Sequence, residues 1–157
     1  MGLVKLKEEY EKLQKKYKFP GFKPMNEDFY IEKIAENQTE LLIREIRRFM
    51  WEKFVNYMRL LEGLINPVNV SMFILSLIKT IDSEDKKIIS EIYKELMNQE
   101  VKVIKLDLEF DEAKEAQFIK ESFEVWQKMK TDLANIFEKL EKGTQEKKEE
   151  NNKDYFG

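Results

Sequence analysis

The chain has 157 residues, of which 38% are charged and 42% hydrophobic, with only 5 Gly and 3 Pro. This composition is typical of one soluble domain built from long helices, because Lys and Glu favour helix and few residues are left for turns. The formal net charge of −3 lacks the basic excess of a duplex-binding protein. Any nucleic-acid role would therefore depend on a local patch.

Missing residue types exclude several kinds of chemistry. The chain has no His and no Cys, which excludes Glu-x-x-His di-iron sites, His-Glu-x-x-His zinc sites, Ser–His and Cys–His nucleophile pairs, and disulfides. The sequence contains no phosphate-binding loop or dinucleotide fingerprint. The amino-terminal segment has no apolar signal region, and the longest uncharged run, 63–78, is too short for a membrane span. We therefore expect a cytoplasmic protein with no membrane segment and no cofactor.

The first 36 residues predict two helices separated by a break. Apolar residues at alternating steps of three and four predict a helix over 3–17. Two prolines and a glycine end it within 19–24, because proline lacks a backbone donor and glycine loosens the backbone. Asn26, with the acidic residues after it, favours a short second helix. The apolar face of that helix would carry Phe29, Ile31 and Ile34.

The middle of the chain predicts one long helix and one short apolar helix. A capping-box pattern, Asn37 followed by Glu40, predicts the start of a helix over 39–65, whose apolar stripe is wide enough to contact two neighbours. Residues 71–80 predict a short helix that is apolar on almost every face. Such a helix is either enclosed by other helices or forms a partner surface.

Two further helices are predicted in the second half. Acidic residues from Asp82 onward favour the start of a helix. Its continuation over 101–110 is ambiguous, because Met97, Val101, Ile104 and Leu108 fit a helix while other apolar residues partly alternate as in a strand. No second strand candidate is visible, so helix is favoured, with a bend near Asp111. The last helix is predicted over 111–142, with Gly143 as its natural stop.

The expected fold class is therefore all-α, an antiparallel bundle of four to five helices forming a single domain over 1–143. Residues 144–157 lose periodicity and are rich in Lys, Glu and Asn, so a disordered charged tail is expected there. The tail ends with two adjacent aromatics, Tyr155 and Phe156, which are typical of a short docking peptide. This end also resembles the C-terminal box that binds DNA sliding clamps, although Glu149 stands where that box has Gln. A tail without a binding role is the alternative.

Every arginine in the chain lies between Arg44 and Arg59. Arginine is the residue preferred for two-pronged contact with carboxylates and phosphates. Three interpretations are open: pairing with the chain's own acidic segment 82–124, a protein-partner surface, or nucleic-acid contact. The candidate contact residues are Arg44, Arg47, Arg48, Trp51, Lys53 and Arg59.

Carboxylate pairs one helical turn apart are the remaining candidate for chemistry. Some all-helical nucleotide pyrophosphatases hold Mg²⁺ with such pairs, since this spacing places both groups on one helix face. With 31 acidic residues, pairs of this kind also arise by chance. Most of them lie opposite the apolar stripes, which favours a solvated face, and no carboxylate is expected inside a stripe. The pairs are Glu8/Glu11, Glu112/Glu115, Glu121/Glu124 and Glu138/Glu141.

Two resemblances accompany these patterns. Lys18-Phe19-Pro20, the arginine-bearing helix and the segment LDLEFDE at 106–112 together resemble uncharacterised archaeal all-helical proteins, and this resemblance implies no activity. Asp28-Phe29-Tyr30 before the arginine-rich helix is distantly similar to the helical domain of GINS replication subunits. In this chain a second long helix takes the place of the small β-domain of that family.

The sequence therefore predicts a non-catalytic helical protein that acts through protein–protein contacts, as an adaptor or an oligomeric scaffold. This expectation follows from the absent catalytic residues and from long heptad-like seams, which can self-associate. The partner would be another protein or a second copy of the chain. Nucleic-acid binding through the Arg44–Arg59 cluster is the first alternative, and a Mg²⁺-dependent carboxylate nucleotide hydrolase is the second.

Overall fold

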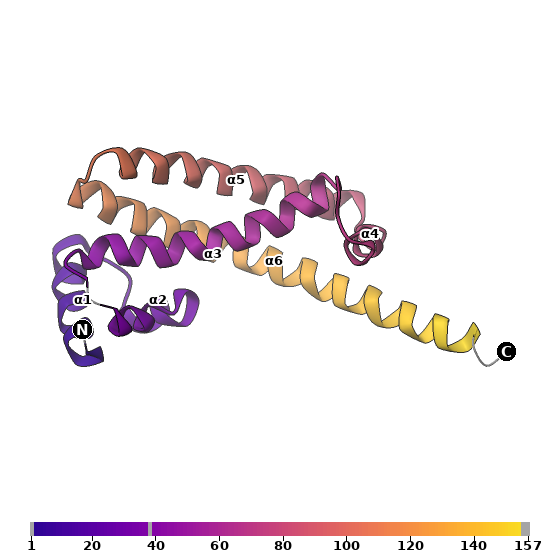
Figure 1. Ribbon diagram of the computed structural model, residues 1–157, viewed down its shortest axis with the longest axis horizontal. Coiled ribbons are helices and arrows are strands. Elements are labelled where there is room, and N and C mark those ends of the chain that lie inside the picture. The colour runs from indigo at the N-terminus through magenta and orange to yellow at the C-terminus, as the bar shows by residue number, and fades with distance from the viewer. Residues whose placement is uncertain (1, 38, 155–157) are drawn as a thin grey trace. The chain divides into compact units, whose positions relative to one another are not determined.

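A computed structural model describes residues 2–37 and 39–154, and the side chains of 2–37 and 39–146 (Figure 1). Every regular element in this part of the chain is helical, which confirms the all-α prediction. None of the helices described combines the length and apolarity needed to cross a membrane. The elements are α1 Leu3–Tyr17, α2 Phe22–Phe29, the 3-10 helix η1 Ile31–Glu36, α3 Leu42–Ile65, α4 Met72–Ile78, α5 Ser83–Leu108 and α6 Glu112–Asp154.

The helix α1 has the bounds that its periodicity predicts. Lys18 caps its C-terminus in the left-handed conformation, with φ 57°, and the chain turns through the segment that contains Pro20. The buried Tyr10 fixes this turn, because its hydroxyl donates a hydrogen bond of 2.8 Å to the Pro20 carbonyl. The Tyr10 ring also contacts Phe19 and Phe22. Burial raises the pKa of the Tyr10 hydroxyl.

The short second helix differs from the prediction at both ends. It starts at Phe22, because Pro24 is tolerated in a first helical turn, where its missing N–H would have no partner. It ends at Phe29, and the next residue, Tyr30, adopts the left-handed conformation with φ 55° and separates α2 from η1. Asn26 does not cap α2. Its side chain instead accepts a 2.8 Å hydrogen bond from the backbone N–H of Glu32, in the first turn of η1.

The long helix α3 begins at Leu42, three residues later than expected. The predicted capping box at Asn37 and Glu40 is wrong, because Asn37 is extended and ends η1, with its backbone N–H bonded to the Ile34 carbonyl. The Thr39 hydroxyl, which accepts a hydrogen bond from the backbone N–H of Leu41 at 3.2 Å, lies just ahead of α3.

The ambiguous stretch after residue 100 is helical, because α5 continues without interruption to Leu108. Asp111 then starts α6, since its carboxylate accepts hydrogen bonds from the backbone N–H groups of Ala113 and Lys114 at 2.9 and 3.1 Å. These bonds lower the pKa of Asp111. The preference for helix over strand and the predicted break near Asp111 are both confirmed. Within the first unit, Figure 1 shows the beginning of α6 running back along the end of α5 after this short turn.

The predicted stop at Gly143 is wrong, because α6 continues through it to Asp154. No glycine in the described part of the chain has a positive φ, so Gly143 is not a left-handed cap. Its missing side chain instead makes room for Thr80, which lies against the Gly143 backbone. Helix therefore extends through 144–154, where disorder was predicted, while Tyr155 and Phe156 lie outside the described residues.

The chain forms two compact units. The first consists of Met1–Asn56 and Leu96–Trp126, and the second of Tyr57–Glu95 and Gln127–Gly157. The core of the first unit is aromatic, since the Phe29 ring contacts both Phe54 and Trp126. The core of the second unit is mainly aliphatic and includes Leu61, Leu64, Leu77, Ile81, Ile89, Leu133, Ile136 and Leu140.

Candidate functional site

Arg47, at the centre of the arginine cluster, is buried in the first unit. Only 5% of it is exposed, and its Nε lies 2.7 Å from the Oε2 atom of Glu115, which is wholly buried. The Nη2 group of Arg47 donates a 2.7 Å hydrogen bond to the Asp107 carboxylate. One guanidinium on α3 thereby joins α5 and α6. Of the three interpretations of the arginine cluster, the structure shows the first for Arg47, which pairs with the chain's own acidic segment 82–124.

The two neighbouring arginines are also matched by carboxylates. The Nε of Arg44 lies 3.5 Å from the Oε1 atom of Glu115, and its guanidinium covers the ring of Phe110 at 5.1 Å. Arg48 donates a 2.7 Å hydrogen bond to Glu45 and another of 2.7 Å to Glu52. The bond to Glu45 makes the largest contribution to raising the pKa of Arg48. Most of the cluster's charge is therefore balanced within the chain.

The other three candidate residues, Trp51, Lys53 and Arg59, each have different surroundings. Lys53 donates to the backbone carbonyl of Asp28, and its Nζ lies 4.4 Å from the ring centroid of Trp126. Trp51 packs against a small buried cluster formed by Val103, Leu106 and Phe118. Arg59 is exposed and belongs to the second unit. Among the described residues it forms no ion pair.

Glu115 is the residue that sequence reasoning missed, because no carboxylate was expected inside an apolar stripe. It is fully buried beside Ala116, and it faces two guanidinium groups. Burial raises the pKa of Glu115, and the charges of Arg47 and Arg44 oppose that effect without cancelling it. The Glu115 carboxylate therefore pairs α6 with α3 through charge, and its burial leaves it without access to a ligand.

Glu115 should give the protein a measurable pH signature. Because its pKa is raised, the folded state binds this proton more tightly than the unfolded state does. The stability that the folded state gains from binding this proton is therefore complete below the ordinary pKa of 4.5. It is lost as pH rises through the raised pKa of the folded state. We expect the free energy of unfolding of the wild type minus that of Glu115→Gln to fall as pH rises. Urea unfolding of both proteins between about pH 4 and about pH 7 measures this difference, and a difference that grows with pH would contradict the effect.

The four carboxylate pairs do not converge on a metal site in the described residues. One member of three of the pairs is already bonded to a lysine: Glu112 to Lys16 at 2.9 Å, Glu121 to Lys102 at 2.8 Å and Glu138 to Lys142 at 2.8 Å. A metal ion would have to displace these lysines. In the part of the chain that the structure describes, no three Asp or Glu side chains are grouped to hold a cation.

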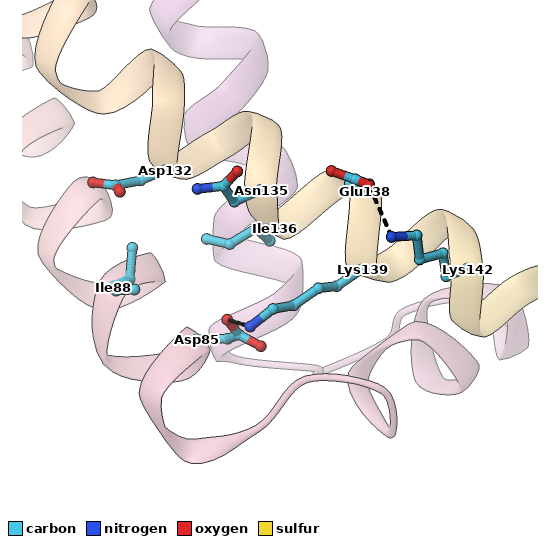
Figure 2. A pocket seen from close by; sticks show the side chains of 8 residues that line it. All are labelled: Asp85, Ile88, Asp132, Asn135, Ile136, Glu138, Lys139 and Lys142. Atoms are coloured by element: carbon cyan, nitrogen blue, oxygen red, sulfur yellow. Dashed lines mark hydrogen bonds and ion pairs between the residues drawn. The ribbon is translucent and has the colours of Figure 1, made fainter.

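A hollow of about 360 Å³ lies between α5 and α6 in the second unit (Figure 2). Lys139 reaches from α6 toward the buried Asp85, whose Oδ1 lies 2.6 Å from its Nζ. Elsewhere on α6, Lys142 donates a hydrogen bond to Glu138 (Figure 2). The lysines that line the hollow are thus paired with carboxylates that also line it. The complete lining is Asp85, Ile88, Asp132, Asn135, Ile136, Glu138, Lys139 and Lys142.

The short helix α4 is exposed on part of its apolar surface. Met72 is 80% exposed and Phe73 is 58% exposed, while Leu77 is buried. Of the two alternatives that the sequence left open for this helix, complete enclosure does not apply within the described residues. Ser71 caps α4 by accepting a hydrogen bond from the backbone N–H of Ile74.

A longer apolar row lies on α5 in the first unit, and we call it the α5 stripe. Its members recur at steps of four, three and four residues, so they share one helix face. They are Met97, Val101, Ile104 and Leu108, which are 39%, 52%, 55% and 83% exposed. The opposite face of α5 is buried and carries Leu96, Gln99, Val103 and Leu106. The helix is therefore apolar on two faces and covered on one.

Comparison of the chain with models of protein families, with curated proteins and with solved structures finds no match in any of the three. The resemblances to uncharacterised archaeal helical proteins and to the GINS helical domain thus remain predictions. Function has to be inferred from the chain's own residues, and the α5 stripe is the feature that its packing leaves unexplained.

Proposed function

We propose that the protein is a non-catalytic interaction or scaffold protein that binds another protein chain through the α5 stripe. The observation that supports this is an exposed apolar row with heptad steps on a helix whose other face is already buried. Apolar surface gains about 25 cal/mol per Å² when it leaves water, so such a row favours a covering partner. A helix that is apolar on both sides is typical of one enclosed on both sides.

The charged groups of the first unit disfavour nucleic-acid binding, because the arginines there are already paired with carboxylates of the chain. Phosphate groups of a nucleic acid would have to displace Glu115 and Asp107 from Arg47, and Glu45 and Glu52 from Arg48. Breaking the buried pair between Arg47 and Glu115 in this way is costly, whereas the pairs of Arg48 lie at the surface. Because no observation favours nucleic-acid binding or Mg²⁺-dependent hydrolysis, we advance neither as a second function.

Site-specific cross-linking tests this proposal. With a photo-reactive phenylalanine analogue in place of Ile104, we expect covalent adducts to a protein chain in cells that express the variant. The same analogue in place of Lys120, an exposed position on α6 of the same unit, should form few adducts. Adding Val101→Glu should abolish the Ile104 adducts, because a carboxylate in the contact would have to be desolvated. Absence of adducts from Ile104, or adducts that persist with Val101→Glu, would refute a binding role for the stripe.

A further inference from the structure

We infer that the chain covering the α5 stripe is a second copy of this protein, whose α5 lies parallel to the first and in register with it. This inference rests on the proposed function and specifies its partner. It follows from the heptad positions of the stripe and from the charges beside it.

The apolar members of the stripe occupy alternating seam positions. With heptad positions lettered a to g, Val101 and Leu108 fall at a, and Met97 and Ile104 fall at d. In a parallel pair in register, each of these side chains meets its own counterpart. The four exposed residues of one copy would then cover the same four of the other, and the contact would be closed and symmetric.

The flanking charges favour the parallel orientation. Glu100 falls at position g and Lys105 at position e of the same numbering. In a parallel coiled coil, a g residue lies beside the e residue five positions further along the partner helix. Glu100 of each copy would therefore lie beside Lys105 of the other, which gives two equivalent attractive pairs. An antiparallel pair would instead bring the g-side acids Glu100 and Asp107 of the two copies together, which is repulsive.

Glu100 and Lys105 also have no ion-pair partner among the described residues of their own chain. By contrast, Lys102 is bonded to Glu121 and Asp107 to Arg47. Lys105 lies at the rim of a hollow lined by Leu106 and Phe118, on the α6 side of the helix. The unpaired acid and the unpaired base thus flank the apolar row on opposite sides, as a parallel pair requires.

The seam has definite ends. One heptad before Met97 and Val101, the corresponding positions hold Ser90 and Lys94, so the apolar contact cannot extend further toward the N-terminus of α5. At the other end α5 stops at Leu108. The contact is therefore shorter than two full heptads, and we expect association that is reversible and depends on protein concentration.

Sedimentation equilibrium of the full chain measures the association. We expect Val101→Glu to raise the dimer dissociation constant about a hundredfold, because each dimer would then bury two carboxylates in an apolar seam. Val4→Glu is the matched control, since Val4 is 74% exposed on α1 and lies outside the stripe. Circular dichroism should show that both variants remain folded, because both positions are exposed. A wild type that stays monomeric at all accessible concentrations would overturn the inference.

The orientation can be tested directly because the chain has no cysteine. Met97→Cys should form a disulfide with its own counterpart under mild oxidation if the helices are parallel. In an antiparallel pair two copies of position 97 would be separated by about 16 Å along the axis, at about 1.5 Å per residue, which is beyond disulfide reach. Disulfides that form only when Met97→Cys is mixed with Leu108→Cys would contradict the parallel arrangement.

Charge reversal tests the proposed ion pairs. Glu100→Lys and Lys105→Glu should each weaken dimerisation alone, because each would place like charges opposite one another. An equimolar mixture of the two variants should form heterodimers, and the double variant should dimerise as the wild type does. No recovery in either case would overturn the paired-charge argument. If the wild type is monomeric while Ile104 still cross-links to a different protein, the proposed function stands and this inference fails.

Discussion

Replacing Glu115 by leucine is expected to lower the free energy of unfolding by about 3–5 kcal/mol, the usual cost of breaking a buried ion pair by removing one partner. Arg47 is 5% exposed, and it would keep only Asp107, whose side chain is 60% exposed. Its guanidinium would remain desolvated beside an apolar group. Urea unfolding at neutral pH measures the loss.

A double variant makes this prediction specific to the ion pair. Arg47→Met with Glu115→Leu replaces both charges by apolar groups of similar size, and we expect it to recover most of the stability lost in the single variants. Glu112→Gln is the control on the same helix, because Glu112 is paired with Lys16 at the surface and should contribute little. Strictly additive effects of the two changes would show that Arg47 and Glu115 do not stabilise the fold as a pair.

Replacing Gly143 by alanine is expected to destabilise the second unit, by about 1–3 kcal/mol. In an unobstructed helix the same change stabilises by about 0.5–1 kcal/mol, because alanine has the higher helix propensity. A Cβ added at Gly143 would lie 2.9 Å from the Cβ of Thr80 and closer still to its Cγ2. Since the Cβ of Thr80 is attached directly to the backbone, the chain would have to shift.

Gly63→Ala is the matched control for the direction of this stability change. Gly63 also lies inside a helix of the second unit, and a Cβ there would meet the side chain of Val70 at 3.8 Å, an ordinary contact. We expect Gly63→Ala to raise the midpoint of thermal unfolding and Gly143→Ala to lower it. Adding Thr80→Gly to Gly143→Ala should recover part of the loss. A stabilising effect of Gly143→Ala alone would refute the close approach of Thr80.

Local signals in the sequence predicted several helices well. The bounds of α1 followed from its apolar steps and from the break at Pro20 and Gly21, because both signals lie within a few residues of the ends. The break at Tyr30 was not predicted, since nothing in its own residue type favours a left-handed conformation. The start of α3 was misplaced because the Asn37 and Glu40 pattern has the spacing of a cap without acting as one.

On α6 the buried row shares Ile119, Trp126, Leu133 and Leu140 with the heptad seam that the sequence suggests, and it differs from that seam at the positions between them. A heptad read from the sequence places Phe123 and Phe137 in the seam, and Lys130 interrupts it. The row that is actually buried is unbroken and runs through Ile119, Ser122, Trp126, Met129, Leu133, Ile136 and Leu140. Glu115 precedes this row by one four-residue step. The buried row is hard to recognise in the sequence because it contains the polar Ser122, whose hydroxyl donates a 3.3 Å hydrogen bond to the buried Gln99.

The candidate surface could be predicted only in part. Heptad-like spacing indicated that the chain can self-associate, and the residues of the α5 stripe were recognised as compatible with a helix. Their exposure was not predictable, because α5 is apolar on two faces and sequence alone does not tell which face the chain covers. The burial of Arg47 was not predictable either. Its acidic partners Asp107 and Glu115 lie about 60 residues or more away in the sequence, so local patterns do not reveal the pairing.

The division into two units has a spectroscopic consequence. Both tryptophans, Trp51 and Trp126, belong to the first unit, so the second unit contains none. Intrinsic tryptophan emission therefore reports on the environment of the first unit, whereas far-ultraviolet circular dichroism records helix in both. The separation or coincidence of these two unfolding curves reveals whether the units melt as one cooperative body.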